Sequence, residues 1–237
     1  MASESFRRSS IWRSFRAAPL VRPLALRLLN ASRPKYETRR YSWGGSLSAL
    51  DACLGHNNVV YLTLRGRYPD VAEGLDVDLL VADDSIEKLD GLLAKEESNV
   101  NIHIDVYPHS FPWDESDPLS PSYLPTRLAE EMLKDRIYDE KYGPIPTPVH
   151  YLDSLTYHLV YHKGFSAAVT ADRSAPRQLL AHKYASRIAF VSESIGIPPL
   201  RSLGECIEYL EGRSLLASGA VLDYWRARNR WLRGVTK

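Results

Sequence analysis

Hydrophobic and polar positions along the first half of the chain follow the spacing expected of a small β-sheet. Residues 59–65 (VVYLTLR) are apolar and rich in β-branched side chains, which predicts a buried strand. Residues 76–82 (DVDLLVA) end in a continuous apolar run, which predicts a second strand covered on both faces. In residues 100–108 (VNIHIDVYP) apolar and polar side chains alternate, which predicts a third strand with one polar face.

Apolar residues at helical spacing occur before, between and after these strands. Residues 44–57 predict a short helix that Ser46 or Ser48 can cap. Residues 85–95 begin with a serine and carry leucines at helical spacing, which predicts a second helix. Residues 109–126 are rich in proline and predict a long loop at a lobe boundary. Helical segments are expected after it at residues 128–143, 151–164, 175–196, 200–212 and 221–234.

This order of elements predicts the α+β class, with a small mixed β-sheet core followed by a helical lobe. The 237 residues, 44% of them hydrophobic, are enough for a substantial core. We expect a basic, flexible segment over residues 1–42, an αβ core over 43–110, and a loop with a helical lobe over 111–237. The only cysteines, Cys53 and Cys206, are too few for a disulfide framework or a zinc site, which fits a reducing compartment.

Positive charge is concentrated in the N-terminal segment. Residues 1–42 hold ten Lys and Arg against Glu4 and Glu37, a net charge of +8, which leaves −7 elsewhere because the total is +1. Such a segment can be a disordered basic tail, a surface helix on anionic lipid, or an organellar transit peptide. No stretch of the sequence approaches the ~20 consecutive apolar residues that a membrane-spanning helix needs. We expect a cytoplasmic protein whose residues 1–42 contact an anionic membrane surface.

Paired carboxylates stand at the start of the second predicted strand. Asp76 and Asp78 share a face because side chains alternate along a strand, and Asp105 on the third strand can join them. Neighbouring carboxylates raise each other's pKa unless a cation lies between them. Mg²⁺ is such a cation, since it binds carboxylate oxygens together with substrate phosphate oxygens. The alternative is a structural role, in which these acids cap a turn or pair with Arg65 or Arg67.

The stretch from LRGRYPDVAEGLDVDLLV to HIDVYP resembles the nucleotidyltransferase superfamily, over roughly residues 46–108. That family has a Gly-Ser turn after its first strand, an Asp-hydrophobic-Asp motif at the start of the second, and another Asp on a later strand. The resemblance implies that Asp76 and Asp78 are catalytic metal ligands, that Asp105 is the third carboxylate, and that Gly66 lies in the phosphate-binding turn. Mg²⁺ or Mn²⁺ would be the cofactor.

The chain departs from the family pattern in this turn, where Arg67 stands in place of the serine. With Arg65 and Gly66, Arg67 can still bind phosphate through its planar guanidinium. The turn could equally be shifted, or the chain could have lost nucleotide transfer. The segment YLDSLTYHLVYHKG is also similar to nucleotidyltransferase-like proteins associated with bacterial surface-polysaccharide loci. That similarity implies a sugar, polyol-phosphate or glycan-phosphate acceptor, and the inner membrane as the surface that residues 1–42 contact.

Basic residues of the helical part are candidates for lining a substrate cleft that faces the acids. His158 and His162 lie four residues apart on one helix face, where they can pack against the neighbouring lobe, line substrate or bind a metal ion. Lys163 and Lys183 can reach a phosphate. Lys163 can instead simply complement the negative end of its helix dipole.

Arginines alternate with two tryptophans in residues 221–234, a pattern that can bind nucleic acid. The net charge of −7 outside residues 1–42 argues against a broad contact with a phosphate backbone. We therefore expect Trp225 and Trp231 to pack inward and the arginines to face solvent.

Taken together, these features predict a Mg²⁺-dependent nucleotidyl- or phosphoryltransferase that uses a nucleoside triphosphate. Its acceptor would be a small molecule, sugar or glycan phosphate that carries a hydroxyl or phosphate group. The alternative is a non-catalytic nucleotide- or glycan-phosphate-binding scaffold on the same fold. A third hypothesis is a membrane-surface or nucleic-acid adaptor that acts through residues 1–42.

Overall fold

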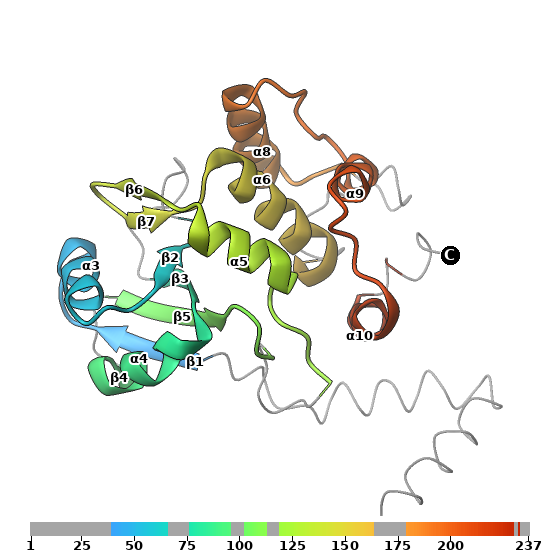
Figure 1. Cartoon of the computed structure of the whole chain (residues 1–237). Coiled ribbons are helices and arrows are strands. Elements are labelled where there is room, and N and C mark those ends of the chain that lie inside the picture. The colour runs from blue at the N-terminus through green and yellow to red at the C-terminus, as the bar shows by residue number, and fades with distance from the viewer. Residues whose placement is uncertain are drawn as a thin grey trace, which may run out of the picture. The chain divides into compact units, whose positions relative to one another are not determined.

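Five strands form one mixed sheet in the computed structural model, which describes residues 39–65, 76–95, 102–112, 119–163, 179–229 and 232 (Figure 1). The strands are β1 (Arg39–Trp43), β2 (Tyr61–Thr63), β3 (Asp76–Val81), β4 (Ala94–Lys95) and β5 (Ile102–Pro108). Their order is β2-β3-β5-β1-β4, in which β3 and β5 are parallel and all other neighbours are antiparallel. The predicted α+β class with a small mixed sheet is confirmed.

Two helices, α3 (Leu47–His56) and α4 (Ile86–Leu92), pack on one face of this sheet. Helix α3 begins where predicted, because the Ser46 side chain accepts a hydrogen bond from the backbone N–H of Ala49. Leu54 and Leu89 of these helices are fully buried against Leu79 and Ile104 of the strands. Alternation along β3 and β5 therefore gives the sheet one wholly apolar face.

The helical lobe packs on the opposite face. Leu62 and Leu80 of the sheet and Tyr107 of β5 belong to the same buried cluster as the lobe's side chains. This core extends across only part of the strands, because β3 changes from exposed at Asp76 to fully buried at Leu80. The lobe consists of α5 (Thr126–Lys134), α6 (Pro148–Tyr157), the π-helix η2 (His158–Lys163), α8 (His182–Ser194), α9 (Leu203–Gly212) and α10 (Gly219–Arg228) (Figure 1).

The single helix predicted over residues 128–143 is wrong in its second half. Helix α5 ends at Lys134, and β6 (Ile137–Asp139) and β7 (Gly143–Ile145) form a separate hairpin. Asp139 shapes the turn, because its carboxylate accepts hydrogen bonds from the backbone N–H groups of Lys141 and Tyr142 at 3.0 and 3.2 Å. Gly143 has a φ of +69°, and a Cβ there would lie 2.6 Å from Asp51 Oδ1. The turn therefore requires glycine.

Strand β1 was not predicted. Its residues 39–42 were assigned to the basic N-terminal segment, yet they pair with β5 in the interior of the sheet, where Tyr41 is 3% exposed. Residues 38–237 form one compact unit, and the expected division of this unit near residue 110 stays a prediction. The predictions of flexibility and membrane contact for residues 1–38 lie outside the described residues. Within the described part of the chain, no helix combines the length and hydrophobicity needed to cross a bilayer.

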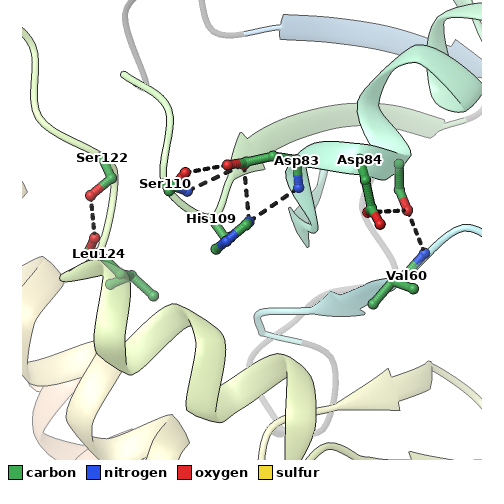
Figure 2. Close-up of polar contacts among 8 residues, drawn as sticks. Val60, Asp83, Asp84, His109, Ser110, Ser122 and Leu124 are labelled. Atoms are coloured by element: carbon green, nitrogen blue, oxygen red, sulfur yellow. Dashed lines mark hydrogen bonds and ion pairs between the residues drawn. The ribbon is translucent and has the colours of Figure 1, made fainter.

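The remaining differences concern element ends. The predicted helix over residues 85–95 begins with a short 3₁₀ turn (Asp83–Ser85) and ends at Leu92, since residues 94–95 form β4. Side-chain hydrogen bonds fix the segments that follow β3 and β5 (Figure 2). The Asp83 backbone N–H donates to His109 Nδ1 at 3.1 Å, and the Ser110 backbone N–H donates to Asp83 Oδ1 at 3.2 Å. These bonds tie together the carboxyl ends of the two parallel strands, whereas Asp76 and Asp78 lie toward the other end of β3.

Candidate functional site

The three predicted acids lie at adjoining positions on one face of the sheet. The parallel register of β3 and β5 places Asp78 beside Asp105 and Asp76 beside His103. Asp76 and Asp78 share their face with Leu80 because they lie two and four residues before it on the strand. Leu80 is buried under the helical lobe, whereas Asp76 is exposed. The acids therefore occupy the rim where the lobe ends and solvent begins.

Asp105 is affected by the charges of its neighbours. Burial raises the pKa of its carboxyl above the ordinary value, and the negative charges of Asp78 and Asp76 raise it further. Arg40 on β1 opposes this shift, since its Nε donates to Asp105 Oδ1 at 3.1 Å. Burial is the largest cause of this upward shift, and repulsion by Asp78 is the largest of its electrostatic causes. A cation that binds beside these carboxylates would relieve that repulsion.

Arg65 pairs with Asp78 across the end of the sheet. Its Nη1 lies 3.1 Å from Asp78 Oδ2, and Tyr107 on β5 donates to the other carboxylate oxygen at 3.2 Å. The structural alternative considered for Asp78, an ion pair with a nearby arginine, is thus present. Gly66 and Arg67, the other two predicted phosphate-binding residues, lie outside the described residues. The Arg65 side chain is 27% exposed, so part of it can still contact a ligand.

The other amino group of Arg65 contacts the helical lobe. Nη2 lies 2.7 Å from the hydroxyl of Tyr123, which precedes α5, and 3.2 Å from Nδ1 of His158 in the π-helix. The Tyr123 hydroxyl in turn lies 2.6 Å from His158 Nδ1. Burial lowers the pKa of His158 well below its ordinary value, and the positive charge of Arg65 lowers it further. His158 is therefore a neutral ring at physiological pH.

His162, one turn after His158, makes the contacts of a packing residue. The two histidine rings stack with their centroids 5.3 Å apart. The His162 ring also lies 4.3 Å from the Tyr123 ring and 4.4 Å from the Trp225 ring, centroid to centroid. Burial lowers the pKa of His162 to about 3. Trp225 is 2% exposed, as expected for an inward-facing tryptophan, and Trp231 lies outside the described residues.

Lys163 adds positive charge near Asp78, and Lys183 lies near Lys163. Lys163 ends the π-helix, and Lys183 lies in the first turn of α8. Burial lowers the pKa of Lys163, the positive charges of Arg65 and Lys183 lower it further, and Asp78 acts in the opposite direction. These effects place Lys163 within electrostatic range of Arg65, Asp78 and Lys183. Of the residues predicted to line a cleft, His158 is buried, His162 is half-buried, and Lys163 is the one whose charge acts on Asp78.

The acids suit Mg²⁺ or Mn²⁺ in their chemistry, because three carboxylates on one face are the ligands that such hard ions prefer. Their present partners are arginines: Arg65 binds Asp78 and Arg40 binds Asp105. Over the described ranges, no group of three or more His, Cys, Asp or Glu side chains is arranged to hold a metal ion. Metal binding at these acids would therefore require at least one of the two arginine contacts to rearrange.

Sequence reasoning missed Arg40, Tyr107 and Tyr123, which contact the predicted site residues. Tyr107 could have been found, because it continues the alternation that starts at Asp105 on the same strand face. Arg40 lies in residues 1–42, whose positive charge leads to their interpretation as a flexible segment. Tyr123 lies in a proline-rich loop, and nothing in the local sequence indicates that this loop passes beside Arg65.

No protein-family model, no curated protein and no solved structure matches this chain. The side-chain geometry at the rim of the sheet therefore carries the functional argument.

Proposed function

We propose that the chain is a Mg²⁺-dependent nucleotidyl- or phosphoryltransferase that uses a nucleoside triphosphate. One observation carries this proposal: the register of β3 and β5 sets Asp78 beside Asp105, with Asp76 two residues away on the same face. Carboxylates in this arrangement suit a divalent ion that also binds substrate phosphates. The similarity of the helical segment to polysaccharide-locus proteins favours an acceptor that is a sugar or a glycan phosphate. A cytoplasmic site, with residues 1–42 at the inner membrane, would suit that acceptor.

Each residue has a role in this proposal. Asp76, Asp78 and Asp105 would hold the metal ion, which supplies positive charge for the phosphate oxygens when it is bound. As the alternative to a ligand role, Asp105 would act as the base that accepts the proton of the acceptor hydroxyl. Arg65 would bind a phosphate oxygen through one of its guanidinium N–H groups. Lys163 and Lys183 would add two cations on the lobe side of the site.

A second candidate is a non-catalytic protein that binds nucleotide or glycan phosphate. The arginine contacts favour it, because Arg65 and Arg40 already neutralise part of the charge of Asp78 and Asp105. In this case the cations near the rim would bind phosphate groups, and the acids would serve to orient those cations. The two candidates differ in whether binding of the phosphate ligand depends on a divalent ion.

Calorimetric titration of each nucleoside triphosphate with Mg²⁺ into the purified protein separates the candidates. For the enzyme, we expect binding that depends on Mg²⁺ and is weakened more than about 100-fold by Asp76→Asn with Asp78→Asn, since even outer-shell partners of metal ligands are worth 10–100-fold. A matched control is Glu208→Gln with Glu211→Gln, which removes two exposed carboxylates from α9.

Either of two results would contradict the proposal that the chain is an enzyme. Binding that is equally strong in the presence of a chelator would favour the non-catalytic candidate. Absence of binding, together with a double aspartate variant more stable than wild type, would mean that the acids repel each other without a metal-binding role.

A further inference from the structure

Arg65 connects the sheet to the helical lobe through its two terminal amino groups. Nη1 lies 3.1 Å from the Asp78 carboxylate on the sheet side. Nη2 lies 2.7 Å from the Tyr123 hydroxyl and 3.2 Å from His158 Nδ1 on the lobe side. A guanidinium is planar and rigid, so fixing both ends fixes the direction of its remaining N–H groups. Arg65 is the last described residue before the predicted phosphate-binding turn.

The order of donors in this network follows from the chemistry of its members. Arginine has only donors, so the Tyr123 oxygen accepts the hydrogen bond from Arg65. The Tyr123 hydroxyl proton is then free to be donated to His158 Nδ1, 2.6 Å away. Nδ1 can accept it only when it carries no proton of its own. The chain of donation therefore runs from Arg65 to Tyr123 to His158, and it ends on a buried ring of the lobe.

The surroundings of Tyr123 and His158 hold these side chains in place. The Tyr123 ring stacks on the Tyr107 ring with centroids 3.9 Å apart, and Tyr107 itself donates to Asp78. His158 begins the π-helix, and its ring stacks on the ring of His162, four residues later, with the centroids 5.3 Å apart. π-Helical turns are rare and occur frequently at functional sites. Such packing leaves the Tyr123 hydroxyl few directions other than toward Arg65 and His158.

We propose that Tyr123 and His158 are positioning residues, which hold the Arg65 guanidinium beside Asp78 in the direction that meets a substrate phosphate. The part of this proposal that concerns phosphate rests on the proposed function, whereas the positioning of Arg65 does not. The helical lobe would thus set the phosphate-binding geometry at the sheet without touching the substrate at these two residues.

NMR spectra of the arginine guanidinium N–H groups in the full chain test the positioning directly. In wild type we expect separate Nη–H signals for Arg65, identified by their absence from an Arg65→Gln variant, because both amino groups are held. Tyr123→Phe keeps the ring stacking and removes only the hydroxyl, so we expect these signals to merge through free rotation. His158→Phe should have the same effect, while His158→Gln, which retains an acceptor, should restore separate signals.

The matched control is Tyr161→Phe, which removes another buried tyrosine hydroxyl whose partner is the backbone N–H of Ala217. This control should leave the Arg65 signals unchanged. If the Arg65 signals stay separate in Tyr123→Phe, the positioning role is overturned. Should His158→Phe fail to fold, the Tyr123→Phe result alone decides, since that change preserves all ring contacts.

Binding of Mg²⁺–ATP by calorimetry tests the link to phosphate. We expect Tyr123→Phe to weaken binding about fivefold, the value of one hydrogen bond. If Tyr123 acts through Arg65, adding Tyr123→Phe to Arg65→Gln should cause no further loss. Independent, additive losses would overturn the link. If wild type binds no nucleoside triphosphate at all, the proposed function fails, and the NMR result still decides the positioning of Arg65.

Discussion

At the scale of single residues, burial changes the charge state of the histidines that face Arg65. His162 lies among the rings of Tyr123, His158 and Trp225, and burial lowers its pKa to about 3. An unfolded histidine takes up a proton below pH ~6.5, whereas this folded one does so only near its lowered pKa. Below pH ~6.5 the unfolded state therefore binds more protons than the folded state. The contribution of the neutral His162 ring to the free energy of unfolding is therefore fully present above pH ~6.5, and it is lost as the pH falls toward 3.

His162→Phe should reduce the loss of stability in acid. A phenylalanine can occupy the same aromatic surroundings and has no proton to gain, so the slope of unfolding free energy against pH should decrease by up to about 1.4 kcal/mol per pH unit between pH ~6 and ~4. Urea unfolding at several pH values measures this slope. His56→Phe, at an exposed position at the end of α3, is the control and should leave the slope unchanged. An unchanged slope in His162→Phe would mean that the ring is charged in the folded state.

At the scale of elements, the helical lobe contains an ion pair between α6 and the end of α9. Asp153 is fully buried on α6, and the Arg213 guanidinium reaches its two oxygens at 3.1 and 2.9 Å. Tyr209 on α9 donates to the same carboxylate at 2.8 Å. A buried carboxylate left without its cation is costly, so the pair fixes how the two helices pack.

Arg213→Met should lower the unfolding free energy by about 2 to 3 kcal/mol, because it leaves Asp153 buried with a negative charge. The loss should be smaller than for a fully enclosed pair, since the Arg213 side chain is 42% exposed. Adding Asp153→Asn should recover part of it. Arg127→Met, which breaks the exposed pair with Glu131 on α5, is the control and should cost less than about 0.5 kcal/mol. If Arg213→Met and Arg127→Met lowered the free energy of urea unfolding equally, the buried pair would have no greater effect on stability than the exposed one.

The sequence predicts elements well where one periodicity dominates and poorly where two meet. Residues 76–81 and 102–108 are recognisable as strands from their apolar alternation, and their acids fall on one face for the same reason. The helix predicted across Asp135 failed, because the apolar spacing of α5 continues into Ile137 and Tyr138 by coincidence. The ion pair of Arg65 with Asp78, and the approach of Tyr123 and His158, depend on how the lobe packs. No local pattern contains that information.

At the scale of the whole molecule, the first strand of the sheet begins at Arg39, inside the segment predicted to be a basic tail. Residues 38–237 form one compact unit that includes β1, so removal of residues 1–37 should leave a cooperatively folded protein. Removal of residues 1–43 should prevent folding, because it deletes a strand that lies between β5 and β4 and takes away the Arg40 partner of Asp105. Thermal unfolding followed by circular dichroism measures both. If the chain that lacks residues 1–43 melted cooperatively at the same temperature as the chain that lacks residues 1–37, the placement of β1 would be contradicted.

The same strand has a consequence for synthesis on the ribosome. Arg40 and its partner Asp105 are 65 residues apart, and β5 must emerge before β1 can pair along its full length. At about 5–20 residues per second, that interval lasts roughly 3 to 13 s. During this time Tyr41 and Trp43, which later face the apolar side of the sheet, remain uncovered on the nascent chain. The arginines that precede Tyr41 in the sequence would then keep these two uncovered aromatic side chains soluble until β5 arrives.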